Sequence, residues 1–243
     1  MTRLTSCPDA ESVAQRAAET IELLIAGALE RRGAAHVALS GGTTPGRTFE
    51  LLAAGATDWA AVHVWFADER CVGPDDPQSN YLLASQKLIG PAGIARERVH
   101  RMEGELGPAE ASSRYAHELA TLAPRSDSYP AGPPVLDVIL LGIGPDGHVA
   151  SLFPGAASLE AGTDALCLGI QDSPKPPPQR LTLSLAVLRA ARSCVLLATG
   201  ASKADAVQAM LGEPTAHVPA SLLARERLTV ILDDAAAPAG PRT

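Results

Sequence analysis

The apolar positions along the chain fall into two patterns, and the first is helical. Between Asp9 and Gly33, apolar residues recur every three or four positions, which predicts a helix that Asp9 caps and Gly33 ends. Further helices are predicted at about 45–54, 79–89, 107–123 and 202–211.

The second pattern consists of short, almost continuous apolar runs, which predict strands. These runs lie at 36–40, 62–66, 136–142, 193–199 and 227–233. Such runs are expected where both faces of a strand are covered. Because strands alternate with helices, the sequence predicts an α/β fold: a mostly parallel, Rossmann-like sheet with helices on both faces. Ligands of such sheets bind at the carboxyl ends of the strands.

Two Pro-rich breaks interrupt this alternation, at 125–134 and 173–179. Neither has the length of a domain linker, so we expect residues 1–243 to form a single domain.

Composition narrows the class of protein. Of the 243 residues, 46% are apolar and 19% charged, which is enough apolar material for a sizeable core. The net charge of −7 argues against a nucleic-acid partner or a membrane surface, although a small anionic ligand stays compatible with it. Aromatic residues make up only 3% and suggest no interface hot spot, so a monomer is weakly favoured.

The cysteines and the apolar runs bear on location. The four cysteines are scattered, and we find no signal-like region at the N-terminus and no apolar stretch of about 20 residues. We therefore expect a reduced, cytoplasmic protein. Cys71 lies beside a charged motif and could be a reactive thiol or a small buried residue.

The stretch LSGGTTPGRTF (39–49) is the first of four motifs at predicted strand ends. Gly41 and Gly42 let the backbone approach an anion closely, and the following helix N-terminus and the hydroxyl of Thr43 or Thr44 can add donors. The motif favours a phosphate site over a plain strand-to-helix turn. It lacks the Gly-Lys-Ser/Thr ending of a Walker loop.

The second motif is the charged triplet Asp68-Glu69-Arg70, which follows a predicted strand. An arginine placed there can hold an oxyanion or carboxylate through two parallel hydrogen bonds. On the triplet alone, a solvated loop with a local ion pair is the better interpretation.

The third motif is the glycine-rich run 142–148, which matches the dinucleotide fingerprint but ends in His148. The fingerprint needs a helix after the turn and an acidic residue on the next strand, and neither is predicted here. The carboxylate of Asp146 would also repel a pyrophosphate. Asp146 and His148 instead suggest a general acid/base pair. A metal site of the Asp-x-His type lacks an evident further ligand.

The fourth motif is a pair of basic residues in separate segments. Arg180 follows the second Pro-rich break, and Lys203 starts the helix predicted after strand 193–199. A lysine in the first turn opposes the helix dipole unless an anion binds at that end. A surface lysine whose stem covers apolar side chains is the alternative.

Taken in order, these motifs resemble the 6-phosphogluconolactonase and glucosamine-6-phosphate isomerase family, over about residues 35–233. The segments that carry the resemblance are LSGGTTP, FADERCV, QSNY, GIGPDGHVASLFPG, RLTL and GASK. Two positions favour the lactonase branch. The deaminases typically have tyrosine where this chain has Arg70, and a catalytic glutamate where it has Phe153.

The resemblance implies a small sugar-phosphate lactone, 6-phospho-D-glucono-1,5-lactone, as substrate and hydrolysis of its ester bond as the reaction. It implies that phosphate binds among backbone amides, a hydroxyl and basic side chains: Gly41, Gly42, Thr43, Arg180 and Lys203. His148 would be the general base and Arg70 the oxyanion stabiliser. Asp146 would orient His148 or hold a sugar hydroxyl, and Asp68 would also bind sugar hydroxyls. No cofactor or metal is required. A deaminase-like enzyme and a sugar-phosphate-binding regulator without turnover remain alternatives.

Overall fold

Six parallel strands form the central sheet within residues 2–125 and 132–238, the ranges that this computed structural model describes. Their order is β1-β9-β8-β5-β2-β3, and every neighbouring pair is parallel. The strands are β1 (Arg3–Cys7), β2 (Ala35–Leu39), β3 (Val62–Phe66), β5 (Val138–Gly142), β8 (Ser193–Ala198) and β9 (Leu228–Asp233). Part of the first Pro-rich break, residues 126–131, lies outside the described ranges.

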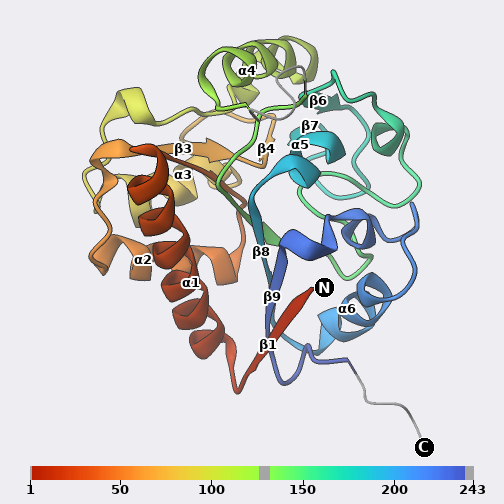
Figure 1. Ribbon diagram of the computed structural model, residues 1–243. Helices are drawn as coiled ribbons and strands as arrows, with labels where there is room; N and C mark the ends of the chain where they lie inside the picture. The colour runs from red at the N-terminus through yellow and green to blue at the C-terminus, as the bar shows by residue number, and fades with distance from the viewer. Residues whose placement is uncertain (1, 126–131, 239–243) are drawn as a thin grey trace, which may run out of the picture.

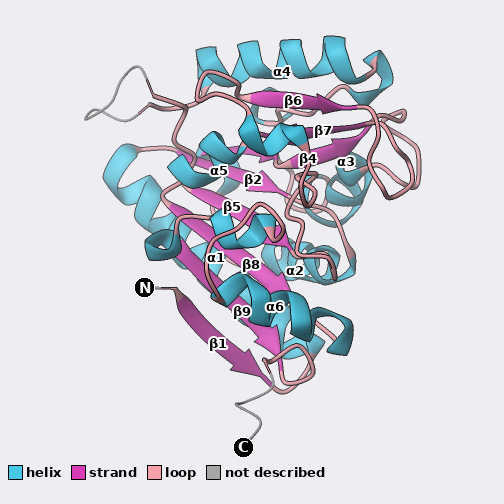
Figure 2. Ribbon diagram, turned by 90° about the vertical axis from the view of Figure 1, so that its right-hand side faces the viewer, coloured by secondary structure: helices cyan, strands magenta, loops and turns pink. Residues whose placement is uncertain are grey.

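Helices cover both faces of this sheet, as predicted (Figures 1 and 2). Helices α1 (Ala10–Arg32) and α2 (Thr43–Ala54) lie on one face, and α5 (Leu185–Ala190) and α6 (Ala204–Leu211) lie on the other. Asp9 caps α1 by accepting a 2.8 Å hydrogen bond from the Ser12 amide, and Gly33 ends it in a left-handed conformation. No helix in the described ranges has the length and apolar content needed to cross a membrane.

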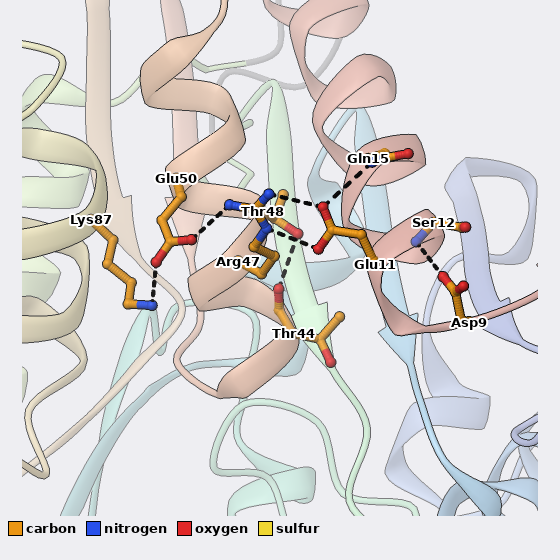
Figure 3. Close-up of polar contacts among 9 residues, drawn as sticks. All are labelled: Asp9, Glu11, Ser12, Gln15, Thr44, Arg47, Thr48, Glu50 and Lys87. Carbon is orange, nitrogen blue, oxygen red and sulfur yellow. Dashed lines mark hydrogen bonds and ion pairs between the residues drawn. The ribbon is translucent and has the colours of Figure 1, made fainter.

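A surface network joins α1 to α2 (Figure 3). Arg47 of α2 bonds Glu11 of α1 at 2.8 Å and Glu50 of its own helix at 2.8 Å. Lys87 completes the chain of ion pairs through Glu50 at 2.6 Å. Each exposed pair contributes little alone, and the network links α1, α2 and Lys87 on the surface beside the Gly41-Gly42 loop.

A small antiparallel sheet, which the sequence patterns did not predict, packs beside the large one. Its order is β4-β7-β6, with β4 at Asp68–Arg70, β7 at Arg180–Leu183 and β6 at Cys167–Ile170. Helix α4 (Pro108–Leu122) packs on β6 and β7. Strands of three or four residues are too short to show an alternation, so their pairing is visible only in the fold.

Several predicted boundaries also shift. Helix α2 begins at Thr43 instead of Pro45. The helix predicted at 79–89 is α3 (Asn80–Ala84) continued by a π-helical turn (Ser85–Ile89). Lys203 lies in a 3₁₀ turn (Ala201–Lys203) that precedes α6.

The strand order creates a crevice between β2 and β5. From β2 the chain moves outward to β3, and it later returns to place β5 on the other side of β2. The loops that leave β2 and β5 therefore diverge at the carboxyl ends of the strands. This is the point at which open α/β sheets bind ligands.

Candidate active site

A cleft of about 420 Å³ opens at this crevice. Its walls include almost all the residues predicted from the sequence to act in the site: Gly41, Gly42, Thr43, Asp68, Arg70, His148, Arg180 and Lys203. Asp146 is not part of the wall, but it contacts His148 directly. The topology thus brings together residues that are up to 162 positions apart along the chain, Gly41 and Lys203.

The loop after β2 forms one wall with its backbone. Gly42 has φ of +130° and stands at the N-cap of α2, so the loop presents peptide groups and the helix N-terminus to the cleft. A Cβ at Gly41 would come within 1.9 Å of Asn80 Oδ1, so a side chain there would displace Asn80. The Oγ of buried Ser40 has no hydrogen-bond partner among the described residues, which leaves one hydroxyl at the base of this wall uncommitted.

The triplet at 68–70 forms strand β4, so the solvated-loop interpretation is wrong. Side chains alternate along a strand, and only Asp68 and Arg70 line the cleft. Glu69 points away and caps α3, accepting hydrogen bonds from the amides of Asn80 (2.7 Å) and Tyr81 (2.8 Å). Burial raises the pKa of Glu69, although these hydrogen bonds act in the opposite direction.

Asp68 and Arg70 are held differently. The Asp68 carboxylate accepts a 2.9 Å hydrogen bond from the Ser151 hydroxyl, and Asn80 donates to its carbonyl oxygen at 2.9 Å. Arg70 donates through Nη1 to the Gln78 carbonyl, while its buried Nε has no partner in the described part of the chain. Nη2 of Arg70 makes no hydrogen bond to the described residues, so Arg70 keeps donor capacity for a ligand.

His148 and Asp146 form a hydrogen-bonded pair in the turn after β5. Their Nδ1 and Oδ1 atoms are 2.6 Å apart. A Cβ at Gly144 would lie 1.9 Å from His148 Nδ1, so glycine is required for the pair to pack against the turn. Gly147, with φ of +81°, lets the chain reverse before the histidine.

The pair fixes the protonation of the imidazole. A carboxylate only accepts hydrogen bonds, so Nδ1 carries the proton and Nε2 keeps its lone pair. Burial lowers the pKa of His148, and Asp146 offsets only part of this effect. Burial is the largest single influence on Asp146 and opposes its ionisation, but the hydrogen bond from His148 and the charges of His148 and Lys175 together outweigh it, so the pKa of Asp146 is lowered. At neutral pH the site therefore holds a neutral histidine beside a carboxylate.

Phe153 lies close to both His148 and Arg180. Its ring centroid is 4.8 Å from that of the His148 ring, and the Arg180 guanidinium carbon lies 5.9 Å from the same ring. Arg180 is only 5% exposed. Burial and the neighbouring charge of Arg70 lower its pKa. A buried aromatic ring therefore lies beside both side chains at the position where the sequence resemblance contrasts phenylalanine with glutamate.

The sequence interpretation missed Lys175, Asn80 and Thr199, which also line the cleft. Thr199, after β8, shares a 2.7 Å hydrogen bond with Thr44, so the Thr44 hydroxyl is already engaged. Lys175 lies within the second Pro-rich break, which carries no predicted element. A lone cation flanked by prolines, a few residues before Arg180, was the available signal.

Two further expectations concern Cys71 and the glycine run. Burial raises the pKa of the Cys71 thiol to about 11, which favours the small, unreactive residue over the reactive thiol. No helix follows the 142–148 turn directly, since the next helical turn is at Ala157–Glu160. The dinucleotide fingerprint therefore lacks its structural context.

The comparisons with known proteins agree with this architecture. A family model described as glucosamine-6-phosphate isomerases/6-phosphogluconolactonase matches residues 8–232. The chain is 39% identical to a 6-phosphogluconolactonase of Streptomyces coelicolor, over 97% of this chain and 93% of the relative. It is 36% identical to a Rattus norvegicus protein of the same name, over 94% and 86%. The chain belongs to the glucosamine-6-phosphate isomerase/6-phosphogluconolactonase family.

Solved structures support the fold assignment. The 6-phosphogluconolactonase of Trypanosoma brucei has a TM-score of 0.85 at 26% identity, with 97% of both chains covered. The Thermotoga maritima 6-phosphogluconolactonase has a TM-score of 0.82 at 28% identity, with 96% of this chain and 99% of that chain covered. A monomeric glucosamine-6-phosphate deaminase is similar in fold, with a TM-score of 0.80 at 23% identity and 97% and 98% coverage.

Proposed function

We propose that the protein hydrolyses 6-phospho-D-glucono-1,5-lactone to 6-phospho-D-gluconate. The observation that carries this proposal is the His148–Asp146 pair, which shares one cleft with Arg70, Arg180 and Lys203. A neutral imidazole suits proton abstraction, and clustered cations suit a phosphorylated substrate. The curated relatives named 6-phosphogluconolactonase support the same substrate.

The phosphate group of the lactone, which is remote from the reacting carbon, supplies much of the substrate's binding energy. It would lie against the Gly41–Thr43 loop, with Lys203 and Arg180 supplying positive charge. Burial lowers the pKa of Lys203, and the nearby charge of Lys175 acts in the same direction, so the positive charge of Lys203 is disfavoured by its surroundings. A bound phosphate would stabilise that charge, and we therefore expect an anion to bind well. Such an anchor orients the lactone ring for attack.

The hydrolysis step begins at Nε2 of His148, which carries no proton. It accepts a proton from a water molecule while the water oxygen forms a bond to the lactone carbonyl carbon. The carbonyl electrons move onto the oxygen, and Arg70 stabilises this oxyanion. When the carbonyl re-forms, the bond to the ring oxygen breaks and His148 returns the proton to that oxygen. Asp146 keeps the imidazole oriented throughout, and Asp68 accepts a hydrogen bond from a sugar hydroxyl.

Lys203 is expected to act on binding. Lys203→Ala should raise KM for the phosphorylated lactone roughly 10–100-fold, the range expected for loss of a charged hydrogen bond. Unphosphorylated gluconolactone should be affected much less. Initial-rate kinetics with both lactones test this expectation. An equal rise for both would remove Lys203 from the phosphate site.

Arg70 is expected to act on turnover. Arg70→Ala should lower kcat about 10²-fold, since an oxyanion donor is worth this much or more. Arg70 also bonds the Gln78 carbonyl, so the thermal midpoint of the variant must be measured beside its kinetics. Arg70→Lys is the matched control, because it keeps the charge without the planar fork. An unchanged kcat in a folded Arg70→Ala protein would refute the role.

Glucosamine-6-phosphate deamination is the alternative within the family. Phe153 supplies no acid or base where the deaminases typically have a catalytic glutamate, so ring opening of an amino sugar would lack a proton carrier. Assays of ammonia release from glucosamine 6-phosphate and of acid release from the lactone, run in parallel, separate the two activities. We expect lactone hydrolysis only. Binding of both compounds with turnover of neither would indicate a regulator.

A further inference from the structure

The segment 173–178 has no regular structure, but it is firmly held at the rim of the cleft. Arg180 donates through Nε to the Pro177 carbonyl at 3.1 Å, and through Nη2 to the carbonyls of Pro176 at 3.1 Å and Lys175 at 3.4 Å. The Ser173 hydroxyl bonds both the amide and the carbonyl of Lys175. The Ser173 amide donates to the Pro178 carbonyl at 2.9 Å. The backbone at Lys175 is thus fixed from both sides.

This anchoring directs the Lys175 side chain to the acid/base pair. Its Nζ lies 3.3 Å from Asp146 Oδ1 and 3.3 Å from His148 Nδ1. Since Nδ1 carries a proton bonded to Asp146, the ammonium donates to the carboxylate and lies beside the imidazole. All three side chains are partly buried, with 36% of Lys175, 34% of Asp146 and 16% of His148 exposed.

We propose that Lys175 is a positioning residue of this site: its ammonium, on the loop that Arg180 anchors, lies against Asp146 Oδ1 and His148 Nδ1 and keeps the imidazole neutral. The inference rests on the proposed function for its catalytic meaning. It also gives Arg180 a second task. Nε and Nη2 of Arg180 donate hydrogen bonds to three carbonyls, so Nη1 remains available to bind a ligand.

The charges around His148 show what Lys175 contributes. Burial is the largest influence lowering the pKa of His148, Asp146 and Asp68 raise it, and Lys175 lowers it further. Lys175 also favours the ionised form of Asp146. Removal of the ammonium should therefore raise the pKa of His148, so that the imidazole becomes protonated at a higher pH.

The test compares Lys175→Gln with Lys175→Arg. NMR titration of the His148 ring in wild type and both variants, without substrate, gives its pKa directly. We expect Lys175→Gln to raise it by about half a pH unit, as for a partly exposed ion pair. Lys175→Arg should restore it, because the charge is kept. An unchanged His148 pKa in Lys175→Gln would overturn the proposal.

Kinetics add a second readout. The acid limb of the pH profile of kcat/KM should move to higher pH in Lys175→Gln by the same amount, and KM at pH 8 should stay within about threefold of wild type. A larger rise in KM with an unmoved acid limb would make Lys175 a phosphate ligand and refute the positioning role. If the wild type fails to hydrolyse the lactone, the proposed function fails, while the substrate-free titration still decides the role of Lys175.

Discussion

Replacing His148 with asparagine is expected to lower kcat for lactone hydrolysis by about 10²–10⁴-fold, the usual contribution of a general base. Asparagine can keep a hydrogen bond to Asp146, 2.6 Å away in the native pair, but it has no equivalent of Nε2. KM should change little, because His148 acts on water and not on the phosphate. Steady-state kinetics with the phosphorylated lactone measure both constants.

The matched control is His117→Asn, which changes an exposed histidine of α4 outside the cleft. It should retain wild-type kinetics. In the wild type, burial lowers the pKa of His148, so the base is present at neutral pH and activity should fall as pH drops through this lowered pKa. A His148→Asn protein with wild-type kcat would show that another group activates the water.

The second large effect is on stability at acid pH and comes from a histidine stack far from the cleft. His36 of β2 and His63 of β3 are register partners, and their parallel rings are 4.5 Å apart. The Trp65 indole donates to His36 Nδ1 at 3.1 Å, which requires that nitrogen to be unprotonated. His63 continues the chain of contacts to His100 at 2.9 Å.

Burial, followed by the neighbouring histidines, lowers the pKa of His36 to about 3; burial, His100 and Arg98 lower that of His63 to about 4. In the unfolded chain both would titrate near 6.5. The unfolded state therefore binds more protons below pH 6.5, and the free energy of unfolding falls as pH falls from 6.5 towards 4. The two groups together should cost on the order of 4 kcal/mol over this window, after allowance for the partial exposure of His63.

Urea unfolding at pH 7.5, 6, 5 and 4.5 measures this loss. His36→Asn is the informative variant, because an amide oxygen can replace Nδ1 as acceptor for Trp65 without titrating. Its unfolding free energy should decline less steeply than that of wild type over the same pH range. Carboxylates titrate equally in both proteins, so the difference in slope isolates His36. Identical slopes would contradict the assignment.

The sequence predicted the parts of the fold that depend on local patterns. Asp9 and Gly33 mark the ends of α1, and the apolar run 62–66 coincides with β3. The cleft follows from strand order, and the motifs at 39–49 and 142–148 do lie at the ends of neighbouring strands β2 and β5. These elements were accessible because capping and hydrophobic spacing act over a few residues.

Long-range pairing set the limits of prediction. Which of the neighbouring side chains Asp68, Glu69 and Arg70 face the cleft cannot be predicted from their sequence, because it depends on the pairing of β4 with β7. Lys175 reaches Asp146, 29 residues earlier, from a loop whose carbonyls at 175–177 accept hydrogen bonds from Arg180. Neither contact leaves a periodic signal in the chain.

Hydrolysis of a phosphorylated lactone in this cleft, with His148 as base, can be tested directly. The most direct test is continuous acid release from freshly prepared 6-phospho-D-glucono-1,5-lactone in weak buffer at neutral pH. Reactions without enzyme give the spontaneous rate, and His148→Asn is run alongside. We predict a rate that rises in proportion to wild-type enzyme and returns close to the spontaneous rate in the variant. A wild-type rate equal to the no-enzyme rate, with the protein folded, would contradict the account.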